Sequence, residues 1–144
     1  MKIVKTCGIA LGLLVAAGLA LFVLIQLIPY GHDHSNPPVL QEPDWDAQTR
    51  AIAKKACFDC HSNEVVWPWY SNVAPVSWLV QSDVEEGRSR LNFSEWGSRR
   101  METDEIGELV AEGEMPPTKY LIMHPDANLT NAERQILINA FGER

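Results

Sequence analysis

The sequence predicts an all-α protein in which one N-terminal transmembrane helix precedes a small domain of short helices. From Cys7 to Ile28 the chain reads CGIALGLLVAAGLALFVLIQLI, 22 residues in which Gln26 is the one polar side chain. As a helix this segment is about 33 Å long, enough to cross the hydrocarbon core of a bilayer. Beyond it, apolar residues recur at helical spacing, and no segment shows the alternation that is typical of a strand.

The apolar segment is either a retained anchor or a cleaved signal peptide. Lys2 and Lys5 supply the short basic start that both have. A signal peptide uses an apolar run of about 7–15 residues before its cleavage site. Here the small-residue site Gly18-Leu19-Ala20 is followed by more apolar chain, which favours a signal anchor over residues 1–30. The basic residues predict a single-pass protein in the bacterial cytoplasmic membrane, with everything after Pro29 in the periplasm.

A proline-rich linker is expected over residues 31–43, which leaves residues 44–144 as the folded domain. The linker reads GHDHSNPPVLQEP and lacks apolar periodicity, as is typical of an extended spacer. His32 and His34 lie in it, and we expect them to be solvated rather than to bind a metal.

Charge is divided sharply along the chain. Lys2 and Lys5 are the only charged residues before residue 31, and the part that follows carries 10 basic and 19 acidic side chains, a balance of −9. This balance argues against nucleic acid as a partner, because nucleic acid is bound through basic surface. It leaves a basic protein partner open.

Four helices are predicted in the domain from apolar stripes and boundary residues. They run from Asp44 to Cys60, from Ser77 to Glu86 before Gly87, from after Thr103 to Gly113, and from Thr130 to Gly142. In the first, Trp45, Ile52 and Ala56 fall on one stripe. The last begins with the capping box Thr130-Asn131-Ala132-Glu133.

Residues 57–61, Cys-Phe-Asp-Cys-His, form the motif with the most reactive side chains in the sequence. Two thiols at this spacing can each add to a vinyl group of one haem, and the adjacent histidine can supply the fifth ligand of the iron. The pattern predicts one covalent haem c, attached through Cys57 and Cys60 with His61 as the proximal ligand.

Two other chemistries also use a Cys-x-x-Cys pair. A redox disulfide normally follows a strand in a βαβ pattern, whereas a helical stretch precedes this one. A zinc site needs a fourth ligand beside Cys57, Cys60 and His61, and His124 is the candidate. The remaining cysteine, Cys7, lies in the membrane segment, so both alternatives are less favoured than haem.

Met115, in Gly113-Glu114-Met115-Pro116-Pro117, is the candidate for the distal iron ligand. A helix is expected to stop at Gly113, and the two prolines stiffen the chain that follows, so a weak thioether ligand can be held at little cost in ordering. The main alternative is His124, in Met123-His124-Pro125. Met123 and an open sixth position are further alternatives.

The residues around the motif are candidates for secondary roles. Arg88 and Arg90 are possible partners of the haem propionates. The backbone carbonyl of Pro68 or of Pro75 is expected to accept a hydrogen bond from the His61 ring. The aromatic residues after the motif are expected mainly to line the core: Trp67, Trp69, Tyr70 and Trp78.

The motifs together resemble a known class. The Cys-x-x-Cys-His helix, the Gly-x-Met-Pro-Pro strap and the C-terminal helix are similar to those of a class I cytochrome c, which implies that His61 and Met115 are the axial ligands. The chain resembles a bacterial haem-binding domain family more closely, from Asn36-Pro37-Pro38 to the C-terminus. The resemblance rests on CFDCHSNEVVWPWY, APVSWLV, GRSRLNFSEW, GEMPP and HPDANLT, and it implies short helices around one covalent haem.

These features predict a one-electron carrier, with redox proteins or a larger membrane respiratory complex as partners. An open or labile sixth position would instead indicate a haem-based gas sensor or a peroxidase-like enzyme. The sequence contains no Ser/His/Asp arrangement, phosphate loop or second haem motif, so an electron-transfer protein is favoured over an enzyme.

Overall fold

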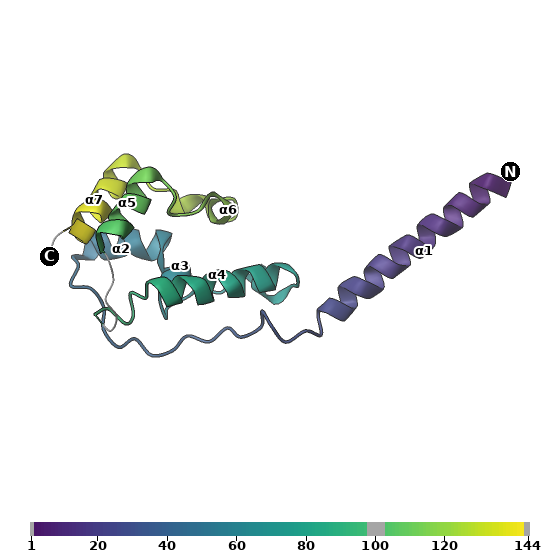
Figure 1. Ribbon diagram of the computed structural model, residues 1–144, viewed down its shortest axis with the longest axis horizontal. Helices are drawn as coiled ribbons and strands as arrows, with labels where there is room; N and C mark the ends of the chain where they lie inside the picture. Colours follow the sequence, from purple (N-terminus) through teal and green to yellow (C-terminus); the bar gives the residue numbers. More distant parts are fainter. Residues whose placement is uncertain (1, 98–102, 143–144) are drawn as a thin grey trace. The chain divides into compact units, whose positions relative to one another are not determined.

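A computed structural model describes residues 2–97 and 103–142. Within these ranges it contains helices and one isolated bridge, between Gln41 and Glu95, but no strand, so the all-α prediction is confirmed (Figure 1). In chain order the elements are α1 (Lys2–Ile25), α2 (Ala47–Ala56), α3 (Phe58–His61), η1 (Trp69–Asn72), α4 (Val76–Arg90), α5 (Thr103–Glu112), α6 (Thr118–Leu121), η2 (Pro125–Ala127) and α7 (Asn131–Gly142), where η marks a 3-10 helix.

Helix α1 is the one helix in the described ranges that is long and apolar enough to cross a membrane. Its stretch Gly8–Ile25 has 18 residues and a mean hydropathy of 2.7, and none of that stretch is buried inside the protein. The predicted N-terminal apolar helix is therefore present. It ends at Ile25, and a turn follows at Gln26 and Leu27.

The chain forms two compact units. The first joins the residues up to His34 with Pro68–Ser82, and the second joins Ser35–Trp67 with the chain from Asp83 onward. The predicted division into anchor, linker and domain stays a prediction. Part of the expected linker nevertheless belongs to the second unit, where the backbone N–H groups of Leu40 and Gln41 both donate to the carbonyl oxygen of Ser94, at 2.8 and 3.1 Å.

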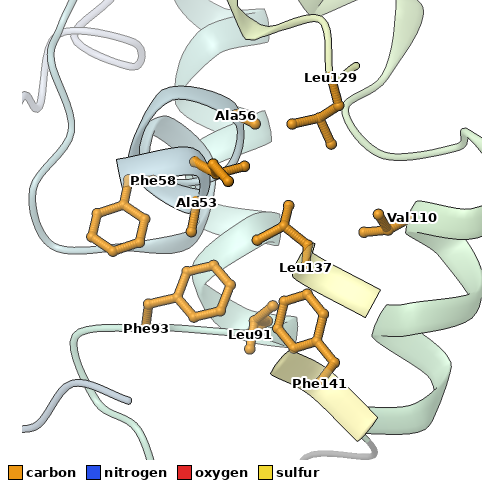
Figure 2. Close-up of a cluster of buried hydrophobic side chains, with 10 residues drawn as sticks. Ala53, Ala56, Phe58, Leu91, Phe93, Val110, Leu129, Leu137 and Phe141 are labelled. Atoms are coloured by element: carbon orange, nitrogen blue, oxygen red, sulfur yellow. The ribbon is translucent and has the colours of Figure 1, made fainter. Parts of the chain in front are cut away.

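The hydrophobic core of the second unit lies where α2, α5 and α7 meet the segment after α4 (Figure 2). Its buried side chains are Ile52, Ala53, Ala56, Phe58, Leu91, Phe93, Val110, Leu129, Leu137 and Phe141. The ring of Phe93 stacks on Phe58 at 5.4 Å and on Phe141 at 6.3 Å. Phe58 is itself part of α3, so the core fixes the helix that carries the Cys-x-x-Cys-His motif.

The helix predicted from Asp44 to Cys60 is in fact two helices. Its cap is Asp46 rather than Asp44, because the Asp46 carboxylate accepts the backbone N–H of Thr49 at 2.8 Å. The helix breaks at Cys57, whose backbone leaves the helical region at φ −129° and ψ −35°. Apolar periodicity continues through this break, which explains why the sequence predicted one helix.

Helix α4 was expected to end before Gly87, and that expectation was wrong. The helix continues to Arg90, with Gly87 in its last turn. A glycine usually ends a helix by adopting a positive φ. Gly87 instead serves close packing, since a Cβ atom on it would lie 2.9 Å from the carbonyl carbon of Cys60.

The predicted end of the third helix and the predicted start of the last one are confirmed. Helix α5 ends at Glu112, and Gly113 follows with φ +77°. The capping box before α7 is formed, because the Thr130 backbone N–H donates to the Glu133 carboxylate at 2.9 Å and the Glu133 N–H donates to the Thr130 hydroxyl at 3.3 Å.

Candidate functional site

One backbone turn gathers the three side chains of the Cys-x-x-Cys-His motif. The carbonyl oxygen of Cys57 accepts the backbone N–H of Cys60 at 3.2 Å and that of His61 at 2.9 Å. Cys57 and Cys60 are both half-buried free thiols, without a disulfide between them. The break between α2 and α3 therefore brings both sulfur atoms and the imidazole to one short turn.

The two thiols are held in their neutral form. Burial raises the pKa of Cys57 to about 12, and the neighbouring Cys60 adds to the shift. Burial likewise raises the pKa of Cys60 to about 12, with a further contribution from the carboxylates of Asp83 and Asp59. A thiol used in disulfide exchange has a lowered pKa, whereas burial raises the pKa of both thiols here. A buried neutral sulfur suits a thioether bond.

The imidazole of His61 is oriented by two backbone carbonyl groups of one neighbouring segment. Its Nδ1 atom lies 3.1 Å from the carbonyl oxygen of Gly87 and 3.2 Å from that of Leu91. A carbonyl oxygen can only accept, so Nδ1 carries the proton and Nε2 is the nitrogen that remains for a metal. Burial lowers the pKa of His61, which keeps the ring in the neutral form that binds iron.

The prediction that the backbone carbonyl of Pro68 or of Pro75 accepts the His61 ring N–H was wrong. Gly87 and Leu91 take that role because α4 runs four residues further than predicted, and its C-terminal end reaches the motif. The Gly87 carbonyl oxygen also accepts the backbone N–H of Leu91 at 2.9 Å, and its two lone pairs allow it to accept from the His61 ring as well. Helix α4 therefore provides both the close contact with Cys60 and an acceptor for His61.

Arg88 and Arg90 are engaged within the protein. Arg88 donates to the carbonyl oxygen of Ser62 at 2.8 Å and to that of Ser35 at 3.2 Å, and so joins the segment before the domain to the end of the motif. Arg90 pairs with Glu86 one turn earlier on the exposed face of α4, at 2.8 Å. Their suggested role as propionate partners stays a prediction.

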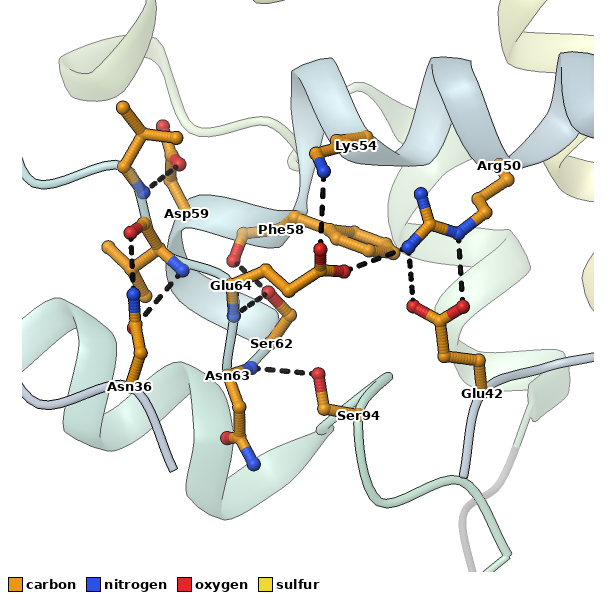
Figure 3. Close-up of polar contacts among 12 residues, drawn as sticks. Asn36, Glu42, Arg50, Lys54, Phe58, Asp59, Ser62, Asn63, Glu64 and Ser94 are labelled. Carbon is orange, nitrogen blue, oxygen red and sulfur yellow. Dashed lines mark hydrogen bonds and ion pairs between the residues drawn. The ribbon is translucent and has the colours of Figure 1, made fainter. Parts of the chain in front are cut away.

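A network of charged side chains links α2 to the residues before it and to those that follow the motif (Figure 3). Arg50 pairs with Glu42 at 2.6 Å and with Glu64 at 2.9 Å, while Lys54 also reaches Glu64 at 3.2 Å. The Arg50 guanidinium lies 5.5 Å from the centre of the Phe58 ring. The residues before α2 and after the motif are thus fixed to the same helix.

Asp59 and Tyr120 form a contact that sequence reasoning missed. The Tyr120 hydroxyl donates to the Asp59 carboxylate at 2.8 Å, and the other Asp59 oxygen accepts the backbone N–H of Val66 at 3.1 Å. Burial, the hydrogen bond and the Asp59 charge raise the pKa of Tyr120. The acidic residue between the two cysteines was the one feature of the sequence that could have suggested this contact, but its partner lies 61 positions further along the chain.

The segment that follows Met115 is connected to the motif and to α4. Tyr120 bonds to Asp59, and Lys119 pairs with Asp83 at 2.7 Å. The ring of His124 stacks on the Tyr120 ring, with the ring centres 4.2 Å apart. His124, the alternative ligand, is thus held flat against a neighbouring aromatic ring.

Met115 lies in a short strap with fixed ends. The backbone N–H groups of Glu114 and Met115 donate to the carbonyl oxygen of Leu109, at 3.0 and 3.2 Å, and Arg134 donates to the Val110 carbonyl at the end of α5. The side chain of Met115 is half-buried and packs against the same hydrophobic core that Cys57 contacts. Met123 is 53% exposed. The structure thus brings Met115 and Cys57 to one core, and its role as ligand stays a prediction.

The residues at the motif fit a haem rather than zinc. Two neutral sulfur atoms and an imidazole with Nε2 available match the demands of two thioether bonds and one iron ligand. In residues 2–97 and 103–142, no three His, Cys, Asp or Glu side chains are arranged to hold a metal ion. The four-ligand arrangement with His124 is therefore not formed there.

Within the described residues the fold is all-helical, and two thiols and one imidazole share a single turn of it. A family model described as "haem-binding domain" matches residues 20–143. The match covers most of the chain, which therefore belongs to the haem-binding domain family, as its motifs predicted. Comparisons with curated proteins and with solved structures gave no significant match.

Proposed function

We propose that this protein is a membrane-anchored c-type cytochrome that carries one haem and transfers one electron at a time. The observation that carries this proposal is the geometry at residues 57–61. Two neutral thiols and an imidazole share one turn, and the imidazole is locked with Nε2 available. Covalent attachment through Cys57 and Cys60 accounts for both thiols, and His61 then serves as the proximal iron ligand.

The protein's own residues hold and tune the redox centre. Bound haem supplies an iron that cycles between the ferrous and ferric states. Donation from Nδ1 of His61 to the Gly87 and Leu91 carbonyl groups fixes the ring orientation and makes the ligand more basic. A rigid frame reduces the rearrangement that accompanies electron transfer, and the buried Phe58 and Phe93 beside the motif provide that rigidity.

Met115 is the sixth ligand in this proposal. Its backbone and that of Glu114 are bonded to Leu109, so the strap is ordered without a ligand. The rival His124 is engaged in stacking on Tyr120. A methionine opposite a histidine gives a higher reduction potential than two histidines, which suits a carrier.

In this proposal α1 anchors the protein in the membrane and places the haem-bearing part in the periplasm. None of its apolar stretch is buried inside the protein, which supports contact with lipid rather than with a protein core. Lys2 and Lys5 precede it, and the positive-inside tendency favours a cytoplasmic N-terminus. The electron partners are redox proteins or a larger membrane respiratory complex, and the excess of acidic residues after residue 30 favours a basic docking surface on them.

An optical spectrum recorded with carbon monoxide distinguishes an electron carrier from a gas sensor or a peroxidase-like enzyme. The full-length protein is produced with an active haem-attachment system, purified in mild detergent and reduced. A carrier with both axial positions filled gives a low-spin ferrous spectrum that carbon monoxide changes slowly or not at all. Rapid conversion to the carbon monoxide complex would contradict the carrier function and favour a gas sensor or a peroxidase-like enzyme.

Protease accessibility tests the proposed orientation. Added protease should digest the haem-bearing part in spheroplasts and leave it intact in sealed inside-out vesicles. Protection in spheroplasts would reverse the orientation. Release of a soluble protein that begins near Leu21 would show that the apolar segment is a cleaved signal peptide.

A further inference from the structure

The first compact unit exposes several large apolar side chains. Between Val65 and Ser82 the chain has no charged side chain, although the next eight residues, DVEEGRSR, contain five. In this uncharged segment the side chains of Trp69, Val76 and Leu79 are 75%, 43% and 51% exposed. Val76 and Leu79 are three positions apart on α4 and therefore share a face of that helix, and exposed apolar faces are a feature of surfaces that contact an apolar partner.

The same segment is bonded to the end of the apolar helix. Gln26 follows α1 directly, and its side chain forms a reciprocal pair with the backbone of Ala74. The Gln26 amide donates to the Ala74 carbonyl oxygen at 3.1 Å, and the Ala74 N–H donates to the Gln26 side-chain oxygen at 2.9 Å. The single polar side chain of the apolar run is therefore used to attach this segment at the point where α1 ends.

Two further contacts make the attachment firm. Gly31, with φ +90°, packs so tightly that a Cβ atom on it would lie 2.8 Å from Ser77 and 2.9 Å from the Trp78 ring. His34 contacts the Ser71 carbonyl oxygen at 3.1 Å through its Nε2 atom. The chain leaving α1 thus wraps around residues 71–78 within one unit.

We propose that residues 69–79, which comprise η1, the first turn of α4 and the three residues between them, lie in the headgroup region of the bilayer that α1 crosses. We call these residues the interfacial segment. Lipid is the occupant because the segment is bonded to the exit of an apolar helix whose 18-residue stretch spans about 27 Å, close to the thickness of a hydrocarbon core. Tryptophan is enriched at that level, where its ring is apolar and its N–H can meet water. The inference rests on the proposed membrane anchor.

The interfacial segment fixes the angle at which the chain leaves the membrane. A single helix followed by a free linker would let the domain rotate and tilt. Bonds from Gln26 and His34 to the segment, together with insertion of Trp69 and Leu79 into lipid, give the first unit a second point of attachment.

Nitroxide labels in the haem-loaded full-length chain test the proposal directly. Cys7→Ala removes the remaining free thiol, because Cys57 and Cys60 are consumed by haem. A label is then placed by Trp69→Cys or by Leu79→Cys in vesicles of phosphatidylcholine and phosphatidylglycerol. Accessibility is measured by power saturation with oxygen, which enters lipid, and with a water-soluble nickel chelate. An unchanged haem spectrum shows that each variant is folded.

The expected result is high accessibility to oxygen and low accessibility to the chelate at both positions, at headgroup depth as calibrated with spin-labelled lipids. Ile122→Cys is the matched control, because Ile122 is also apolar and 75% exposed but belongs to the second unit. Its label should be accessible to the chelate. Leu14→Cys, in the middle of α1, reports on the anchor itself.

Each other outcome overturns a defined part of the account. Chelate access at Trp69 and Leu79, with the Leu14 label in hydrocarbon, would refute the interfacial segment and leave the anchor in place. Labels that neither reagent reaches would show that protein or haem covers the segment instead of lipid. A lipid signal at Ile122 would show non-specific insertion of labels. A Leu14 label in water would overturn the anchor and the interfacial segment together.

Discussion

Gly87 of α4 lies directly against the backbone of Cys60. A Cβ atom on Gly87 would be 2.9 Å from the Cys60 carbonyl carbon and 3.0 Å from its Cβ atom. Real Cβ atoms do not approach backbone so closely, and the backbone of a packed turn cannot move away without cost. The absence of a side chain at this one position lets α4 approach the Cys-x-x-Cys-His turn and place two carbonyl groups beside His61.

Gly87→Ala should therefore damage the haem site. We expect α4 to be displaced, both Nδ1 contacts of His61 to lengthen, and stability to fall by about 1–3 kcal/mol through overpacking. The measurements are the ratio of haem to protein after expression and the reduction potential. Less haem is expected per chain, and the loosened ligand should shift the potential.

Gly107→Ala is the matched control for that substitution. Gly107 also lies inside a helix, but a Cβ atom there would be 3.9 Å from the Phe141 Cβ, an ordinary contact. Alanine is the better helix former by about 1 kcal/mol, so this variant should be at least as stable as wild type. If Gly87→Ala behaves like Gly107→Ala, the close contact with Cys60 has no role in the site.

Met115→Ala should lower the reduction potential and open the iron to carbon monoxide, because a thioether favours ferrous iron more than an imidazole does. His124→Ala should leave the ligation unchanged. The ferric wild type should show the weak long-wavelength absorption band of sulfur bound to haem iron, and Met115→Ala should lack it.

Two results would assign the sixth position differently. Survival of the long-wavelength band in Met115→Ala would transfer the role to Met123. Absence of the band in the wild type, together with a high-spin spectrum for His124→Ala, would establish two histidine ligands.

Tyr120→Phe should destabilise the protein by about 1–2 kcal/mol, because it removes a hydrogen bond to a charged group and leaves the stack on His124 intact. Denaturant unfolding measures the change. The same measurement on Asp59→Asn and on the double variant Asp59→Asn, Tyr120→Phe completes a double-mutant cycle. The two effects should be non-additive because the side chains are in direct contact, whereas additive effects would show that the bond contributes nothing.

Acid should weaken the contact between α2 and α7. Hydrogen bonds from Lys55 and from the Thr130 backbone lower the pKa of Glu133 from its ordinary value of 4.5 to about 2. A carboxyl group with a lowered pKa stabilises the fold fully above pH 4.5, and this contribution is lost as the pH falls toward 2. The pair is partly exposed, so together with the cap it contributes about 1 kcal/mol.

The unfolding free energy of the wild type should therefore fall more steeply between pH 4.5 and pH 2 than that of Glu133→Gln. Glutamine can keep part of the capping box but cannot titrate, which makes it the appropriate comparison. Parallel pH profiles for the two proteins would show that Glu133 does not contribute in this way.

Local signals predicted the features that depend on neighbouring residues. The capping box of Thr130 and Glu133 spans only four residues, and Gly113 ends α5 by its own backbone conformation. Both features could therefore be predicted from the sequence. The apolar run of α1 was readable for the same reason. The family, too, follows from short contiguous motifs.

Features that depend on tertiary packing were not predictable in this way. Gly87 looks like a helix end in the sequence, and only the proximity of Cys60 gives it another use. The acceptors of the His61 ring are backbone atoms, which carry no sequence signal. The bond between Asp59 and Tyr120 joins segments that nothing in the sequence pairs.

Retention of haem by the denatured chain tests the central claim most directly. The full-length protein is produced with an active haem-attachment system, denatured and separated from free haem, and the intact mass of the polypeptide is measured. The account predicts the mass of the chain plus one haem for the wild type, and the mass of the chain alone for the double variant Cys57→Ala, Cys60→Ala. A wild-type polypeptide that loses its haem on denaturation would contradict covalent attachment at this site.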